Sequence, residues 1–174
     1  LATVPSELFG VVIATRDGTL YSAGDVDYTF AIESTAKPFT AALVMQQYGG
    51  PEAIQEKIGV EPTGLPFNSK FPLLLLDERS VNPMVNAGAL VATGLIRGAD
   101  PDARFARLRA SLRGYLGHDV ALDEAALASR QQGDHVNYAL AHLLRSQGLL
   151  GVDVDAVIDL YARQCSLKVD CRDL

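Results

Sequence analysis

The stretch FAIESTAKPFTAALVMQQYG, residues 30–49, places one lysine at the start of a strongly apolar run. Lys37 follows Ser34 by three residues, and Pro38 comes next. Proline has no N–H donor and fits the first turn of a helix, while Gly49 and Gly50 are typical of a helix end. Because the segment is apolar nearly all round, we predict a buried helix over residues 35–48.

The segment before this helix, FGVVIATRDGTLYSAGD, has the pattern of two strands joined by the turn Asp17-Gly18. We predict a hairpin over residues 9–24. Its first strand is almost continuously apolar, so we expect it to be central or buried. We expect no good strand after residue 23. Since a two-stranded sheet is marginal by itself, partner strands should come from elsewhere or the chain should be part of a larger protein.

The rest of the chain is dominated by helical patterns. We expect a short helix over residues 51–59, and a loop over the Gly- and Pro-rich segment 59–72. Further predicted helices cover residues 86–96, 101–117, 122–132, 134–148 and 153–169. The sequence therefore predicts one α+β domain over residues 1–174, with the hairpin followed by a helical region over 34–170.

Composition argues against several classes of function. The chain has 174 residues, 48% of them hydrophobic, and a net charge of −6. It lacks the basic clusters of nucleic-acid-binding proteins, an apolar run long enough to span a membrane, and the features of a signal peptide. Cys165 and Cys171 are too few for a disulfide framework and lack zinc-site spacing. We therefore expect two reduced thiols in a cytoplasmic protein with no metal or other cofactor.

Ser34 and Lys37 have the spacing of a nucleophile and its base, because residues three apart share a helix face. A serine hydroxyl attacks only after a base takes its proton, whereas an exposed lysine, with a pKa of about 10.4, is protonated. Burial and the positive end of a helix both lower a lysine pKa. We therefore predict a neutral Lys37 that deprotonates Ser34, as in the penicillin-recognising serine enzymes. The alternative is a chance serine beside a lysine that reaches solvent.

Several blocks of the sequence occur in an order that resembles the serine-dependent glutaminase family, which hydrolyses L-glutamine to L-glutamate and ammonia. The blocks are FAIESTAKPFTAALVMQQYG, GVEPTGLPFNS, NPMVNAGALV, NYALAHLLRSQG and LYARQCSLKVDCRDL. The resemblance implies a β-lactamase/transpeptidase-like fold, in which helices surround an antiparallel sheet. It also implies L-glutamine as substrate and assembly into a homo-oligomer.

The resemblance assigns roles to individual residues. Ser34 and Lys37 match the nucleophile and its base, Asn86 and Asn137 match substrate-binding asparagines, and Tyr161 matches an active-site tyrosine. These types suit the task, because amides pair with the polar ends of an amino acid and a tyrosine hydroxyl relays a proton. Taken alone, each has a plainer interpretation: Asn86 as a helix cap, Asn137 as a surface residue, Tyr161 as core.

The chain also departs from the family pattern. Arg130 stands where the resemblance implies a glutamate that helps to hold the substrate, and Asp134 is a possible substitute one turn later. The family's C-terminal strands, a second active-site tyrosine and a Gly-rich oxyanion segment have no match here, so we expect an incomplete glutaminase domain. The leading hypothesis is glutamine hydrolysis; the alternatives are an impaired relative acting as a binding or assembly module, or another serine amidohydrolase.

Overall fold

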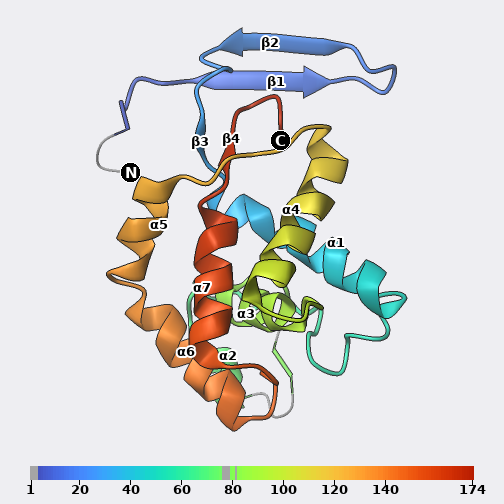
Figure 1. Cartoon of the computed structure of the whole chain (residues 1–174), viewed down its shortest axis with the longest axis vertical. Coiled ribbons are helices and arrows are strands. Elements are labelled where there is room, and N and C mark those ends of the chain that lie inside the picture. The colour runs from blue at the N-terminus through green and yellow to red at the C-terminus, as the bar shows by residue number, and fades with distance from the viewer. Residues whose placement is uncertain (1–3, 76–78, 81) are drawn as a thin grey trace.

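The computed structural model describes residues 4–75, 79–80 and 82–174 of the chain (Figure 1). It is an α+β protein in which a hairpin lies across one end of a body of helices. The elements in order are β1 (Gly10–Ala14), β2 (Leu20–Gly24), β3 (Phe30–Ala31), the 3₁₀ turn η1 (Glu33–Thr35), α1 (Ala36–Tyr48), α2 (Phe71–Leu75), α3 (Asn86–Leu95), α4 (Pro101–Leu116), α5 (Glu124–Gln131), α6 (His135–Ser146), α7 (Val154–Cys165) and β4 (Lys168–Val169).

Helices α3 and α7 form the centre of the helical body. Helix α3 contacts α1, α6 and α7, and α7 also contacts α4 and α5. Every residue of α3 from Asn86 to Thr93 is buried, as expected for a helix that is apolar on all sides. The helix predicted over residues 35–48 is confirmed as α1. It ends at Gly49, which has a φ of 89° and donates its N–H to the Met45 carbonyl.

The predicted hairpin is confirmed, but the predicted burial of its first strand is wrong. Strands β1 and β2 pair antiparallel, and the Asp17 carboxylate accepts hydrogen bonds from the Thr15 hydroxyl and the Thr19 N–H. Yet Ile13 in β1 is 58% exposed and all of β2 is exposed. Among the described residues β1 pairs with β2 alone, so neither face of this ribbon is fully covered.

A second antiparallel pair joins the hairpin to the helical body. Strand β3 pairs with β4, with Phe30 opposite Val169, and the Ile32 N–H donates to the Leu167 carbonyl at 2.8 Å. The expectation of no further strands missed these elements, because two residues are too few to form a recognisable pattern. This pair places the start of α1 beside the end of α7 (Figure 1).

The helix predicted over residues 51–59 is also wrong. The segment forms turns, and Ile58 makes a parallel bridge to Ser80. Gly59 donates its N–H to the Ser80 carbonyl, and Ser80 donates its own to Lys57. Because isolated helices this short are marginal, the pairing with residue 80 takes the backbone groups instead. The neighbouring loop predicted over 59–72 is irregular until α2 begins at Phe71.

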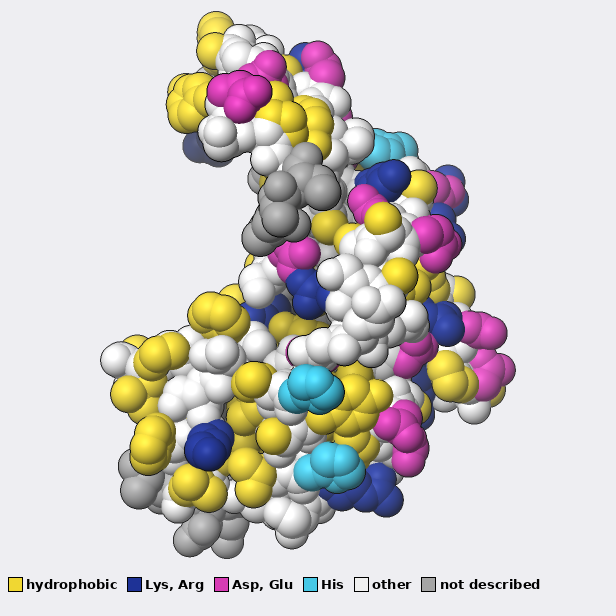
Figure 2. Space-filling view, turned by 90° about the vertical axis from the view of Figure 1, so that its left-hand side faces the viewer, with side chains coloured by type: hydrophobic (Ala, Val, Ile, Leu, Met, Phe, Trp, Pro, Cys, Tyr) yellow, Lys and Arg dark blue, Asp and Glu magenta, His cyan; other side chains and the backbone are white. Residues whose placement is uncertain are grey.

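The space-filling view shows the hairpin as a separate lobe, with a hollow between it and the helical body (Figure 2). Charged side chains of both signs lie in the hollow, whereas apolar side chains gather over the lower part of this face. Within the described segments, no helix has both the length and the apolar character needed to cross a membrane.

Candidate active site

Ser34 and Lys37 lie at the junction between η1 and α1. Ser34 is in the 3₁₀ turn and is exposed, whereas Lys37, the second residue of α1, is only 3% exposed. Their side chains meet all the same, because the turn leads directly into the helix. The Lys37 amine lies 3.1 Å from the Ser34 hydroxyl, within reach for proton transfer.

The surroundings of Lys37 favour the neutral amine. Its Nζ donates to the Asn86 Oδ1 at 2.8 Å and lies 5.5 Å from the centre of the Phe67 ring. None of the described carboxylates forms an ion pair with it. Burial lowers the pKa of the Lys37 ammonium, and the neighbouring Cys165 only partly opposes the shift. A buried amine without a counter-ion loses its proton more easily than one in water.

A chain of side-chain hydrogen bonds continues from Lys37 into the protein. The Asn86 amide donates to Asn137 Oδ1 at 2.9 Å, and the Asn137 amide donates to Asp134 Oδ1 at 2.7 Å. Both asparagines are buried, at 6% and 5% exposed. These hydrogen bonds connect the starts of α1, α3 and α6 and fix the orientation of both amides. They leave the Asp134 Oδ2 buried without a hydrogen-bond partner.

The plainer interpretations of the two asparagines do not hold. Asn86 is the first residue of α3 and does not cap it; the Asn82 side chain instead accepts the N–H groups of Met84 and Val85. Asn137 is buried rather than a surface residue. Asp134 entered the sequence analysis only as a substitute for glutamate, and its bond to Asn137 was not foreseen. The sequence feature that indicates this bond is the spacing of three residues between Asp134 and Asn137 at the start of a helix.

Tyr161 comes from α7 and joins the same cluster. Its side chain is 2% exposed, and its hydroxyl lies 3.4 Å from the Asn86 Oδ1. Burial, together with the nearby Cys165, raises the pKa of Tyr161, so the hydroxyl stays protonated and acts as a donor. Burial likewise raises the pKa of the Cys165 thiol. The position of Cys165 beside this cluster was not predicted from the sequence, although Cys165 follows Tyr161 by four residues on one helix face.

Arg130 lies at the edge of this cluster, on α5. Its guanidinium forms an ion pair with Glu33, the residue before Ser34, and the two side chains are 24% and 41% exposed. Glu33 has a φ of 54°, an uncommon backbone conformation for a residue other than glycine. The positive charge of Arg130 favours the ionised forms of Tyr161 and Cys165, but burial outweighs it. Arg130 therefore brings a cation to within one residue of Ser34.

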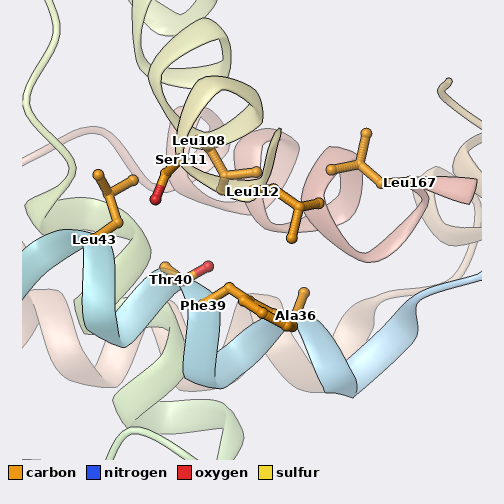
Figure 3. Close-up of a pocket in the computed structure, with 8 residues that line it drawn as sticks. All are labelled: Ala36, Phe39, Thr40, Leu43, Leu108, Ser111, Leu112 and Leu167. Carbon is orange, nitrogen blue, oxygen red and sulfur yellow. The ribbon is translucent and has the colours of Figure 1, made fainter. Parts of the chain in front are cut away.

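A separate small cavity lies between α1 and α4 (Figure 3). Its volume of about 10 Å³ is at the lower limit for one water molecule. The only polar side chains on its wall are those of Thr40 and Ser111; the others, all apolar, are Ala36, Phe39, Leu43, Leu108, Leu112 and Leu167. It is a packing gap in the core, and we assign it no ligand. In the described part of the chain, no three His, Cys, Asp or Glu side chains cluster as metal ligands do.

Comparison with known proteins decides the family. The sequence model of the family described as Glutaminase matches residues 1–174. The chain belongs to the glutaminase family. A glutaminase of Brucella canis is 43% identical over 174 residues, which are 100% of this chain and 55% of that protein. A glutaminase of Escherichia coli O81 is 42% identical over the same 174 residues, 56% of its length.

Solved structures show the glutaminase fold as well. A probable glutaminase called YbaS superposes with a TM-score of 0.95 at 43% identity, covering 99% of this chain and 56% of that one. A probable glutaminase of Bacillus subtilis gives 0.90 at 27% identity, covering 94% and 53%. A structure described as Mglu in its glutamate form gives 0.89 at 31% identity, covering 99% and 40%. The chain thus spans about half the length of the glutaminases it matches.

Proposed function

We propose that this protein hydrolyses the side-chain amide of L-glutamine to L-glutamate and ammonia through an ester on Ser34. One observation carries the proposal: the exposed Ser34 hydroxyl lies 3.1 Å from the amine of Lys37, which is 3% exposed. Membership of the glutaminase family supports the substrate. The 31%-identical Mglu structure in its glutamate form supports binding of the product in a related site.

In the first half of the reaction, the neutral Lys37 amine takes the Ser34 proton as the Oγ attacks the amide carbon of glutamine. Backbone N–H groups at the start of α1 favour the negative charge on the tetrahedral oxygen. The carbon–nitrogen bond then breaks, and the leaving nitrogen takes the proton from the Lys37 ammonium. Ammonia departs and a glutamyl ester remains on Ser34.

In the second half, Lys37 is neutral again and takes a proton from a water molecule that attacks the ester. The ester bond breaks, Ser34 recovers its proton from Lys37, and glutamate is released. The balance is one glutamine and one water in, one glutamate and one ammonia out. The step requires no metal or other cofactor.

Asn86, Asn137 and Tyr161 act around this pair. Asn86 Oδ1 accepts from both the Lys37 amine and the Tyr161 hydroxyl, so it holds the base in one orientation. Asn137 fixes the Asn86 amide from the other side. The protonated Tyr161 is a hydrogen-bond donor inside the cluster, placed to steady the nitrogen of Lys37 through Asn86 while the proton moves.

The direct test is ammonia release from glutamine by a Ser34→Ala variant of the intact protein. We expect a loss of at least about 10³-fold in kcat, since nucleophile removal from serine hydrolases costs this much or more. Thr35→Ala is the matched control: Thr35 is the next residue, carries an exposed hydroxyl and makes no capping hydrogen bond. It should retain nearly all activity.

Mass spectrometry of the protein quenched during turnover adds a second readout. A glutamyl adduct on the peptide containing Ser34, absent from Ser34→Ala, is the expected result. Equal ammonia release by wild type and Ser34→Ala would reject the mechanism. Glutamine binding without turnover by the wild type would instead favour a binding module.

Assembly and location are further inferences from the family. We infer a homo-oligomer that works in the cytoplasm, where the two free thiols, Cys165 and Cys171, remain reduced. Light scattering on the purified protein measures the oligomeric state. Fractionation of the producing cells measures the location.

A further inference from the structure

A groove of about 440 Å³ lies at the opposite ends of α1 and α3 from the candidate active site. Lys37 and Asn86 are near the first residues of these helices, and Tyr48 and Leu95 are their last. At a rise of about 1.5 Å per residue, the groove is separated from the site by most of the helix length. The groove, hereafter the basic groove, is lined by Tyr48, Lys57, Gly94, Leu95, Ile96, Arg97, Gly98, Arg104, Leu149, Gly151 and Val152.

Among the residues that the structure describes, three cations and no acidic side chain line the basic groove. Lys57, Arg97 and Arg104 form no ion pair within the described ranges. Two acids close in sequence to lining residues take part in helix caps instead: Asp100 caps α4 and Asp153 caps α7. Three cations in one groove without an ion pair among the described residues are unusual in a chain whose net charge is −6. They concentrate positive potential in this groove.

Contacts at the groove orient the Arg97 side chain. The Arg97 backbone N–H donates to the Gln47 side chain, and the Arg97 guanidinium lies 4.2 Å from the centre of the Tyr48 ring. The Tyr48 hydroxyl in turn donates to the Leu95 carbonyl. Side chains positioned in advance lose little entropy on binding a ligand.

Arg104 adds an unsatisfied donor. Its Nε is buried and has no hydrogen-bond partner. The side chain packs so closely on Gly98 that a Cβ there would lie 2.6 Å from the Arg104 Cγ. A buried donor left unpaired is costly, and a shift of the side chain toward an acceptor atom in the groove would remove that cost.

Compensation of the helix dipole at the helix ends does not explain all three cations. Arg97 follows the end of α3, where a positive charge stabilises the helix. Arg104, by contrast, is the fourth residue of α4, whose start is already positive. A cation at that end does not stabilise the helix dipole, although Asp100 and Asp102 lie at the same end.

We propose that the basic groove binds a small molecule that carries a phosphate group on an apolar body. Three cations match the charge of a phosphate monoester, up to about two negative charges, better than the single charge of a carboxylate, and arginine forks fit phosphate oxygens. The apolar body rests on the other half of the lining, formed by Leu95, Ile96 and Leu149 together with Val152. This site is independent of the proposed hydrolysis.

The test is calorimetric titration of the intact protein with adenosine 5′-monophosphate, inorganic phosphate and adenosine. We expect the monophosphate to bind more tightly than inorganic phosphate, and adenosine not to bind. Arg97→Gln and Arg104→Gln should each weaken monophosphate binding about tenfold, the usual effect of losing a charged hydrogen bond. Added NaCl should weaken binding as well.

Arg107→Gln is the matched control, because Arg107 lies one turn beyond Arg104 on the same helix, is exposed, and is outside the groove. Both Arg107→Gln and Ser34→Ala should bind the monophosphate as the wild type does. Adenosine binding as tightly as the monophosphate, or Arg97→Gln and Arg104→Gln binding it unchanged, would overturn the proposal. So would the absence of any monophosphate binding up to about 10 mM, or inorganic phosphate binding as tightly as the monophosphate.

Discussion

The hairpin of β1 and β2 and the helix pair of α1 and α3 both contain apolar runs but have opposite burial. Ile13 in β1 is 58% exposed, whereas Leu90 in α3 is 0% exposed. Helix α3 packs against three other helices; β1 pairs, in the described part of the chain, with a single exposed strand. An apolar run thus predicts which surface tends to be buried by other elements. Whether cover is present depends on the rest of the fold.

This difference matters for function because the proposed base needs burial. Lys37 belongs to the helix pair, whose core is supplied by α6 and α7 within the same chain. The pKa shift of its amine comes mainly from burial. The helical body therefore contains the surroundings on which the chemistry depends, and the hairpin contributes none of the side chains in the hydrogen-bonded cluster.

The largest effect should follow from removing the amine. Lys37→Met keeps an apolar stem of similar length but cannot accept the Ser34 proton. We expect kcat for glutamine to fall by about 10²–10⁴-fold, the usual contribution of a general base. Ammonia release measures it. Two control variants should leave kcat unchanged: Lys70→Met, at an exposed lysine, and Ile13→Ser, in the hairpin. If kcat falls as far in Ile13→Ser as in Lys37→Met, the two regions do not differ in their importance for catalysis.

The protonation of Lys37 should determine how kcat/KM of the wild type depends on pH. The base must be neutral, so kcat/KM should rise with pH as Lys37 loses its proton. Because burial lowers the pKa of this amine, the midpoint of the rise should lie below the ordinary value of about 10.4. A profile that stays flat up to that pH and rises only above it would show a lysine that is not shifted.

Stability should separate the two regions next. Leu90→Ala opens a cavity in the centre of the helical body and should lower the free energy of unfolding by about 2–5 kcal/mol. Ile13→Ala removes a side chain that is 58% exposed and should cost less than about 1 kcal/mol. Urea denaturation of both variants gives the two values. Equal losses would mean that the hairpin is covered in solution by something the contacts among the described residues do not show.

The candidate site residues were predicted from the sequence, but the hydrogen bonds that join them were not. Ser34 and Lys37 were found from their spacing, because both lie within one turn of chain. Asn86 and Asn137 are 51 residues apart, and no local pattern predicts that their amides meet; the family resemblance alone brought them together. The ion pair between Arg130 and Glu33 likewise joins two distant segments, and it depends on the tertiary fold.

The errors in the predicted elements have the same origin. The helix expected over residues 51–59 was replaced by pairing with Ser80, and the burial expected for β1 required neighbours that local pattern does not supply. In both places a long-range partner, present or absent, decided the outcome. The confirmed elements, such as α1 and the Asp17-Gly18 turn, are those whose ends are set by a few adjacent residues.

The smallest predicted effect lies at the border between the two regions, where Arg130 pairs with Glu33 just before Ser34. If glutamine binds with its α-ammonium group toward α5, a cation there would repel that group, and it also occupies the Glu33 carboxylate that would attract it. Arg130→Gln should therefore lower KM for glutamine by only about two- to fivefold, with kcat little changed, because the pair is partly exposed and screened. Arg163→Gln is the matched control, since Arg163 is 27% exposed and pairs with Asp102 and Asp159. If KM rises in Arg130→Gln and not in Arg163→Gln, Arg130 instead binds the α-carboxylate, and the substrate lies with its charged end toward α5.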